Sequence, residues 1–134
     1  MRSNGATLNG QLSRVISEMG HTEQIVVTDA GLPIPTGVER VDLALRPGTP
    51  SFLDVLDTVL GEMVIEGAIT STEIAQVSPD MLAEIEHRLE PLGVVLQLIP
   101  HADFKKRTAG SRAAVRSGEF TSYANVILIA GVAY

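Results

Sequence analysis

The sequence predicts a single compact α/β domain in which a mostly parallel sheet is flanked by helices. Two observations support this fold class. Short runs of β-branched residues alternate along the chain with amphipathic helical patterns, and no internal repeat, low-complexity stretch or linker interrupts the 134 residues. Because this length corresponds to one ordinary domain, we expect one domain over residues 1–134.

The first three expected elements are a helix, a strand and a loop. Apolar residues recur at helical spacing over 12–19, and Gly20 follows them as a helix stop. The β-branched run 25–27 predicts a buried strand that ends near Asp29. Segment 30–35 contains two prolines, which exclude a helix interior and predict a loop.

A strand, a helix and another strand are expected next. Residues 41–45 predict the strand. Thr49 as the cap and Pro50 at the first position predict a helix whose apolar face lies within 52–60. Residues 63–65 predict a further strand.

The last part of the chain predicts two helices and two strands. Pro79 opens a helix whose apolar stripe runs over 81–89. Residues 94–99 predict a strand and residues 101–108 a helix. The apolar run 125–132 predicts a buried strand.

Composition restricts the chemistry. The chain contains no cysteine, which excludes disulfides, thiolate nucleophiles and cysteine-based zinc sites. Ten basic against sixteen acidic residues give a net charge of −6, which argues against nucleic acid as the partner. The first residues lack the apolar stretch of a signal peptide, and the run 126–134 is far shorter than the roughly 20 residues of a membrane helix. We therefore expect a cytoplasmic protein without membrane insertion.

The three histidines occupy different settings. His87 lies about half a turn from the apolar stripe of its helix and is expected at the surface. His21 follows the helix stop at Gly20, where an imidazole suits proton transfer at neutral pH or serves as a helix cap. His101 follows a predicted strand, at the sheet edge where α/β folds bind ligands, or it simply begins the next helix.

Four other side chains are candidates for contact with a polyol. Asp29 ends a predicted strand, where a carboxylate accepts bonds from a hydroxyl or caps a turn. Tyr123 and Asn125 combine a flat apolar surface with an amide, although both are also common packing and turn residues. Five of the ten basic residues lie within 105–116, which favours a solvated basic helix face; alternatively, Lys105 turns into a polar pocket.

Common catalytic motifs are missing from the sequence. It contains no phosphate-binding loop, no HExxH and no GxSxG. Two strand-end histidines together with Asp29 lack a metal-ligand spacing. We therefore expect no metal site.

Segment 20–35, GHTEQIVVTDAGLPIP, resembles the N-terminal signature of the D-ribose pyranase family. Residues 41–45 with 48–52, 116–119 and 123–128 resemble the family in the same order, so the resemblance covers essentially the whole chain. The related fucose mutarotases share the Gly-His start and a Tyr-x-Asn near the end. The Asp-Ala-Gly-Leu-Pro-Ile-Pro run is similar to the ribose branch.

The resemblance implies an isomerase that interconverts the pyranose and furanose forms of free D-ribose without a cofactor. It implies a ring-like homo-oligomer, a pentamer-based ring or a decamer, with sugar sites near subunit contacts. His21 corresponds to the acid–base residue. The positions that correspond to ribose contacts are Asp29, His101, Lys105, Tyr123 and Asn125.

The implied chemistry is modest. Ring opening breaks no carbon–carbon or carbon–hydrogen bond, so acid–base assistance of roughly 10²–10⁴-fold is sufficient catalysis. Two other functions stay open at this point: a non-catalytic ribose-binding accessory protein that uses the same pocket, and a mutarotase for another sugar such as L-fucose.

Two expectations concern assembly. The apolar runs 126–134 and 63–68 predict burial beyond what one small sheet offers, as in an oligomer. We further hypothesise that the sugar site is shared between neighbouring chains. In this hypothesis His21 and Asp29 come from one chain, and Tyr123 and Asn125 from the other.

Overall fold

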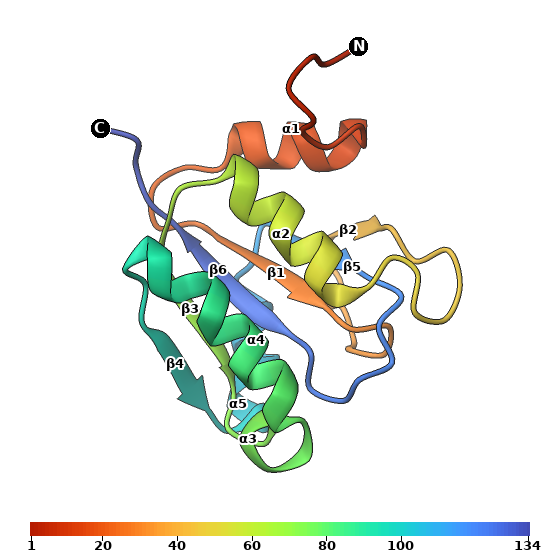
Figure 1. The fold of residues 1–134 in the computed structure, drawn as a ribbon, viewed down its shortest axis with the longest axis vertical. Helices are drawn as coiled ribbons and strands as arrows, with labels where there is room; N and C mark the ends of the chain where they lie inside the picture. Colours follow the sequence, from red (N-terminus) through yellow and green to blue (C-terminus); the bar gives the residue numbers. More distant parts are fainter.

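Six strands form one mixed sheet in the computed structural model, which describes residues 1–134 (Figure 1). The strands are β1 (Gln24–Thr28), β2 (Glu39–Asp42), β3 (Ile65–Ser71), β4 (Leu96–Ile99), β5 (Ala113–Arg116) and β6 (Val126–Ala130). Their order across the sheet is β2-β5-β1-β6-β3-β4. The predicted single α/β domain is thereby confirmed.

Strand direction divides the sheet. The pairs β1–β5, β2–β5 and β3–β4 are parallel, whereas β6 runs antiparallel to both β1 and β3. The sheet is therefore mixed: β1 to β5 share one direction, as expected of a mostly parallel sheet, and β6 alone is reversed. The alternation of helices and strands does not predict the direction of β6. The connection from β5 to β6 is the irregular segment 117–125, not a crossover helix.

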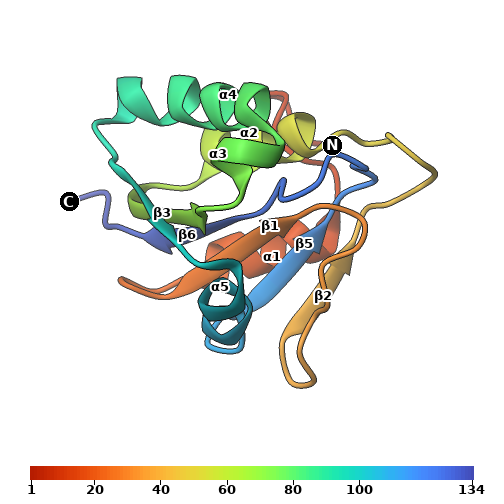
Figure 2. The same cartoon turned by 90° about the horizontal axis from the view of Figure 1, so that it is seen from below.

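Helices cover both faces of the sheet. They are α1 (Gly10–Glu18), α2 (Phe52–Glu62), α3 (Ile74–Val77), α4 (Pro79–Leu89) and α5 (His101–Thr108), with a short 3₁₀ helix, η1 (Glu90–Leu92). Figure 2 shows α2, α3 and α4 on one side of the sheet and α5 on the other. The helices expected over 12–19, from Pro79 and over 101–108 are confirmed. None of the helices is long and apolar enough to cross a membrane.

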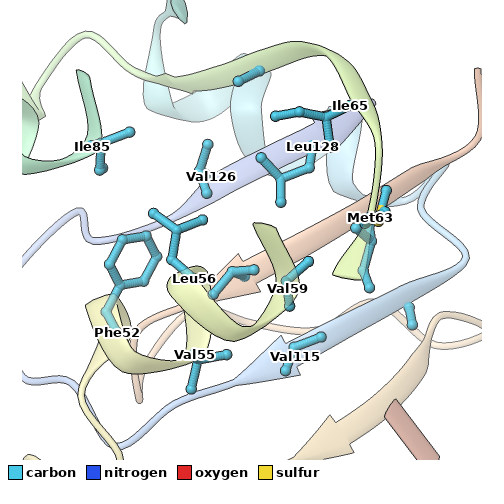
Figure 3. Close-up of a cluster of buried hydrophobic side chains, with 14 of the residues drawn as sticks. Phe52, Val55, Leu56, Val59, Met63, Ile65, Ile85, Val115, Val126 and Leu128 are labelled. Carbon is cyan, nitrogen blue, oxygen red and sulfur yellow. The ribbon is translucent and has the colours of Figure 1, made fainter. Parts of the chain in front are cut away.

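Two packed layers hold the helices to the sheet. The larger layer contains 21 buried residues, and Figure 3 shows Phe52 and Leu56 of α2 directed toward Val126 and Leu128 of β6. Burying one such side chain contributes about 1.5–3 kcal/mol. The smaller layer on the other face contains seven buried residues, among them Phe104 of α5. Because both faces are covered, the central strands β1 and β6 are almost continuously apolar.

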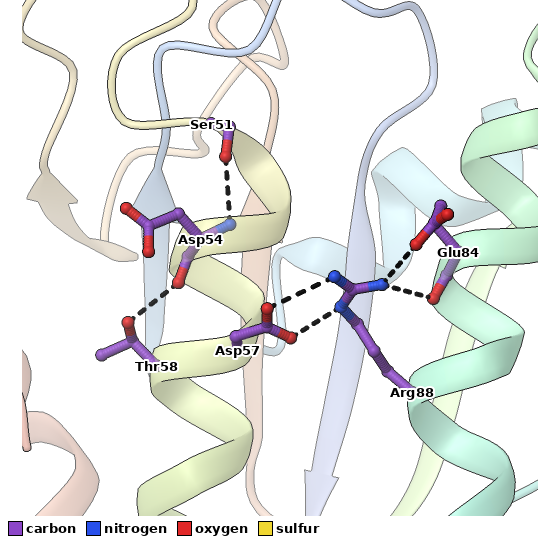
Figure 4. Close-up of polar contacts among 6 residues, drawn as sticks. All are labelled: Ser51, Asp54, Asp57, Thr58, Glu84 and Arg88. Carbon is purple, nitrogen blue, oxygen red and sulfur yellow. Dashed lines mark hydrogen bonds and ion pairs between the residues drawn. The ribbon is translucent and has the colours of Figure 1, made fainter.

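The predicted start of α2 is wrong. Ser51 is the N-cap and accepts a bond from the N–H of Asp54 at 3.1 Å, so the helix begins at Phe52. Thr49 instead closes a turn, because its N–H donates to the carbonyl of Arg46 at 2.9 Å. Figure 4 shows the Ser51 cap together with Arg88 of α4, which binds Asp57 of α2 at 2.6 Å and fastens the two helices to each other.

The other differences concern boundaries and short elements. The strands expected over 41–45, 63–65 and 94–99 are confirmed in place but shifted to Glu39–Asp42, Ile65–Ser71 and Leu96–Ile99. Strand β5 and helix α3 were not expected. The sequence of β5, AAVR, contains two alanines and a single β-branched residue, which is too little pattern to predict a strand.

Candidate functional site

Asp29 and Asn125 meet where β1 ends and β6 begins. The N–H of Asp29 donates to Oδ1 of Asn125 at 2.8 Å, and Nδ2 of Asn125 donates to Oδ2 of Asp29 at 3.3 Å. The antiparallel pairing of β1 with β6 causes this meeting, because the end of one strand faces the start of the other. Asn125 is 1% exposed, and its own carbonyl accepts a bond from the buried hydroxyl of Thr70 at 2.8 Å.

Asp29 also caps the loop that follows it. Its Oδ1 accepts bonds from the N–H groups of Gly31 at 3.0 Å and Leu32 at 2.8 Å, which confirms the turn-capping interpretation. The other oxygen, Oδ2, has only the long bond from Asn125. A carboxylate oxygen accepts about two bonds, so Oδ2 retains capacity for a ligand hydroxyl.

His101, the first residue of α5, is linked to this region through β3, where Thr70 bonds Asn125 and the next residue, Ser71, bonds His101. Its Nδ1 is 2.8 Å from the hydroxyl of Ser71, which is fully buried at the end of β3. The ring meets Tyr123 edge-on at a centroid distance of 5.0 Å and stacks on Phe104 at 6.1 Å. The ring of His101 is therefore held by one hydroxyl and two aromatic side chains. Its other nitrogen, Nε2, has no hydrogen-bond partner within the chain.

The backbone of His101 is anchored by Glu73. The N–H of His101 donates to both carboxylate oxygens of Glu73 at 3.1 and 3.0 Å, and these bonds satisfy a free donor at the start of α5. The bond from the hydroxyl of Thr72, assisted by the N–H of His101 and opposed by burial, holds the pKa of Glu73 below its ordinary value. Glu73 thus stays ionised while it fixes the histidine.

Tyr123 adopts a left-handed backbone conformation with φ of 64°. Thr22, next to His21, is the only other non-glycine residue with a positive φ, at 69°. Such conformations cost of order 1–3 kcal/mol and persist where the surroundings impose them, commonly at functional sites. In this chain both strained residues lie at or beside a candidate site residue.

Lys105 joins the same region through α5. It lies four residues after His101, so both side chains project from one side of the helix. Lys105 is exposed and makes no side-chain hydrogen bond, as expected for a solvated basic face. Two other basic residues of the predicted cluster are paired, Arg112 with Glu23 at 3.0 Å and Arg116 with Asp42 at 3.1 Å.

His21 lies at the opposite end of β1. It belongs to the turn between α1 and β1 (Figure 1). The N–H of Thr22 donates to the carbonyl of Ala130, at the far end of β6, at 2.9 Å. Five strand residues span about 17 Å, so His21 and Asp29 are too far apart to contact one small ligand. The hypothesis that groups His21 with Asp29 is wrong, because Asp29 is bonded to Asn125 of its own chain.

The helix-capping interpretation of His21 is also wrong. Met19 is the C-cap of α1, and its N–H donates to the carbonyl of Ile16 at 3.2 Å. The imidazole of His21 is 51% exposed, and its Nε2 is 2.9 Å from Oε2 of Glu66 at the start of β3. His87, as expected, is exposed on α4.

Sequence reasoning missed the partners of both histidines. Ser71 ends β3 and Glu73 follows it, which is the same signal that singled out Asp29, but the expected strand stopped six residues too early to reveal them. No sequence pattern marks Glu66, because it contacts His21 only where β6 holds the turn between α1 and β1 beside the start of β3. The structure gathers no group of three side chains that could hold a metal ion.

The motif Arg116–Glu119 supports the fold around the site. Glu119 accepts the N–H of Phe52 at 3.0 Å and the hydroxyl of Thr121 at 2.8 Å, so it caps α2 from a distant segment. Burial raises the pKa of Glu119, but the bonds from Phe52 and Thr121 outweigh it and keep the pKa below its ordinary value. At Gly118 a Cβ atom would lie 2.6 Å from the carbonyl oxygen of Arg46, so only glycine fits.

Solved structures share this arrangement of elements. The structure of Bacillus subtilis RbsD complexed with D-ribose matches with a TM-score of 0.94 and 37% identity, covering 99% of this chain and 100% of that one. The fucose mutarotase from Streptococcus pneumoniae in complex with L-fucose matches with a TM-score of 0.81 at 23% identity, covering 98% and 100% of the two chains, which shows a common fold.

Curated relatives match along their whole length. A D-ribose pyranase of Laribacter hongkongensis is 51% identical over 136 residues, covering 100% of both chains. A D-ribose pyranase of Vibrio vulnificus strain YJ016 is 50% identical and covers 96% of this chain and 97% of its own. The sequence of residues 2–133 matches one protein family. The chain therefore belongs to the RbsD / FucU transport protein family.

Proposed function

We propose that this protein is a cytoplasmic D-ribose pyranase, an isomerase that interconverts the pyranose and furanose forms of free D-ribose. The observation that carries the proposal is the polar cluster of Asp29, His101, Tyr123 and Asn125, held together at the end of the sheet where β1 ends and β6 begins. It occurs in a chain that is 51% identical to a D-ribose pyranase over its full length.

The cluster has the hydrogen-bonding capacity that a polyol needs. Oδ2 of Asp29 offers acceptor capacity, Nδ2 of Asn125 keeps a second N–H, and Nε2 of His101 is unpartnered within the chain. The exposed ammonium of Lys105 adds a flexible donor from the same side of α5. Tyr123 supplies an apolar ring beside them. These groups suit the hydroxyls of the sugar ring and the carbonyl of its open form, whichever anomer is bound.

The reaction itself requires two proton movements. The anomeric hydroxyl loses a proton while the ring oxygen gains one, the bond between the anomeric carbon and the ring oxygen breaks, and an open aldehyde forms. A different hydroxyl then closes the ring by the reverse steps, so protons and bonds balance. A single imidazole that alternates between base and acid serves both directions, and we assign this role to His21.

His21 requires a second copy of the chain to reach the cluster. The length of β1 separates the two within one chain, about 17 Å at the usual rise of a strand. We therefore propose that a neighbouring subunit contributes His21 to the site formed by Asp29, His101, Lys105, Tyr123 and Asn125. A ring based on pentamers, or a decamer of two such rings, is the assembly that the family resemblance implies.

The apolar surface that a neighbouring subunit would cover is not the one expected from the sequence. The runs 126–134 and 63–68 owe most of their apolar character to β6 and β3, which lie inside the sheet of one chain, so they give no support to an oligomer. Large apolar side chains are exposed elsewhere, with Val95 85%, Leu45 72% and Phe120 71% exposed. Phe120 lies three residues before Tyr123, so a subunit that covers it also approaches the polar cluster.

Magnetisation-exchange NMR on D-ribose tests the function. Saturating the anomeric proton of a pyranose form and observing the furanose forms measures exchange directly. We expect a substoichiometric amount of the protein to accelerate this exchange. A ribose-binding protein without catalysis would leave the exchange rate unchanged at that ratio, and faster exchange for L-fucose than for D-ribose would favour the mutarotase of another sugar.

A further inference from the structure

The contact between His21 and Glu66 determines which nitrogen of the imidazole carries the proton. Nε2 of His21 is 2.9 Å from Oε2 of Glu66. A neutral imidazole carries one N–H and one lone pair, whereas a carboxylate only accepts hydrogen bonds. Nε2 must therefore carry the proton in this contact, and the lone pair resides on Nδ1, which makes no hydrogen bond within the chain.

The backbone on both sides of this contact is fixed by one strand end. The N–H of Thr22 donates to the carbonyl of Ala130 at 2.9 Å, and the N–H of Gly131 donates to the carbonyl of Val64 at 2.9 Å. Adjacent residues at the end of β6 thus hold both the turn that carries His21 and the start of the strand that carries Glu66. The sheet, rather than chance contact between two mobile side chains, brings the pair together.

The turn is also braced from its other side. The N–H of Gly20 donates to Oε1 of Glu23 at 2.7 Å, and Oε2 of Glu23 pairs with Arg112 at 3.0 Å. A Cβ atom on Gly20 would lie 2.9 Å from that Glu23 oxygen, so the residue before His21 is held closely against the brace. With the backbone fixed, the remaining freedom of His21 lies in its side-chain torsions, and Glu66 restricts these.

We propose that Glu66 is a positioning residue that holds neutral His21 in the tautomer with its proton on Nε2, so that His21 exchanges protons with the sugar through Nδ1. The proposal rests on the function proposed above. In the forward step Nδ1 takes the proton of the anomeric hydroxyl, and the imidazolium formed is stabilised by the carboxylate of Glu66. Nδ1 then returns that proton to the oxygen released by ring opening, so no net proton is consumed.

His101 provides the contrast within the same chain. Its Nδ1 meets the hydroxyl of Ser71, and a hydroxyl both donates and accepts, so this contact permits either tautomer. Only the contact with a carboxylate selects one. The inference therefore applies to His21 and not to the histidine of the polar cluster.

The test measures tautomer and catalysis separately on the intact assembly. Histidine labelled with ¹⁵N reports the tautomer by long-range ¹H–¹⁵N correlation, and the spectra of His21→Ala and His87→Ala assign the three signals. We expect the Nε2–H tautomer for His21 in the unaltered protein. In Glu66→Gln we expect a mixture of tautomers, because an amide also donates, and a fall of about tenfold in the maximal ribose exchange rate.

The accompanying variants exclude a merely structural effect. The ribose concentration at half-maximal rate should stay unchanged in Glu66→Gln, because Glu66 is not among the groups proposed to contact the sugar. Glu66→Asp, which keeps the carboxylate, should restore the Nε2–H tautomer and most of the rate. Glu86→Gln, at an exposed position of α4, should alter neither the tautomer nor the rate. Thermal unfolding verifies that each variant is folded.

Two results would overturn the inference. An Nδ1–H tautomer of His21 in the unaltered protein contradicts it even if the enzyme is active. A Glu66→Gln variant with unchanged tautomer and unchanged rate contradicts it as well. Failure of the unaltered protein to accelerate ribose exchange is a different result, since it refutes the proposed function, whereas the tautomer of His21 is measured without any activity.

Discussion

The two ends of the sheet carry histidines in different environments. In the turn before β1, His21 is half exposed, with a carboxylate as its polar partner. At the opposite end, after β4, His101 is bonded to a buried hydroxyl and packed against Phe104 and Tyr123. An exposed ring with an ionic partner is suited to gaining and losing a proton, whereas an enclosed ring is suited to holding a ligand in place. Surroundings, rather than residue type, therefore separate the two proposed roles.

The largest expected effect comes from removing the exposed imidazole. His21→Ala should lower the rate of ribose exchange by about 10²–10⁴-fold, because the acid–base group is lost. The fold should persist, since the side chain is 51% exposed and outside the core. Exchange NMR measures the rate, and His87→Ala, an exposed histidine of α4, should retain full activity. Near-normal exchange by the His21→Ala protein would remove His21 from the mechanism.

Mixing variants of the two ends tests whether neighbouring chains share the site. His21→Ala and His101→Ala should each be nearly inactive alone, and co-refolding equal amounts should restore activity at about a quarter of the sites in a cyclic assembly. Mass spectrometry must show mixed oligomers, and each variant alone must be folded. Mixed oligomers that remain inactive would contradict a site built from His21 of one chain and His101 of its neighbour.

At the His101 end, Glu119 supports the segment that carries Tyr123. Glu119→Gln should destabilise the fold by about 1 kcal/mol at pH 7, because it weakens the cap of α2. The folded-state pKa of Glu119 is lowered, so its stabilisation is present above the unfolded pKa of about 4.3 and disappears as the pH falls through the lower folded value. Thermal unfolding at pH 7 and below pH 4 measures this difference.

The matched control for Glu119 is Glu86→Gln. Glu86 is exposed on α4, and its change should leave the unfolding temperature nearly constant at pH 7. If the loss of stability in Glu119→Gln were the same in acid as at neutral pH, the ionised carboxylate would not be the source of the stabilisation.

The smallest expected effect lies at the His21 end. Thr22 has a φ of 69°, which costs a residue with a side chain roughly 1–2 kcal/mol, whereas glycine adopts it freely. Glycine also loses more chain entropy on folding, so Thr22→Gly should stabilise the protein by less than about 1 kcal/mol, a rise of a few degrees in Tm. Thr36→Gly, in an exposed loop at an ordinary φ, should not stabilise it. Equal effects of both changes would argue against strain at Thr22.

Local patterns predicted the helices better than the sheet. Residues 101–108 and the helix from Pro79 were located correctly because spacing, prolines and caps lie within a few residues of each other. The direction of β6 was beyond such patterns, because it depends on the path of segment 117–125 around the sheet. The buried strand expected over 125–132 is confirmed as β6, but the apolar run 126–134 was also assigned to subunit contacts, because its place between β1 and β3 was not foreseen.

The candidate site shows the same limit. Residue type, predicted strand position and family resemblance singled out Asp29 and Asn125, but their contact joins residues 96 positions apart and needs the antiparallel pairing of two strands. Glu66 carries no sequence signal, and the strand-end position of Ser71 was hidden by the misplaced strand; each matters only through the histidine that the fold places beside it. Sequence therefore identified the chemical groups, whereas only the fold revealed which of them act together.

The central place of β6 has a consequence for biosynthesis. The strand joins β1 to β3, yet it is the last of the six strands to leave the ribosome. Until it emerges, the nascent chain holds two half-sheets whose apolar edges have no partner, and such edges invite association with other chains. Folding of this domain should therefore be completed only after β6 has been synthesised, and overproduction at high temperature should favour inclusion bodies over native protein.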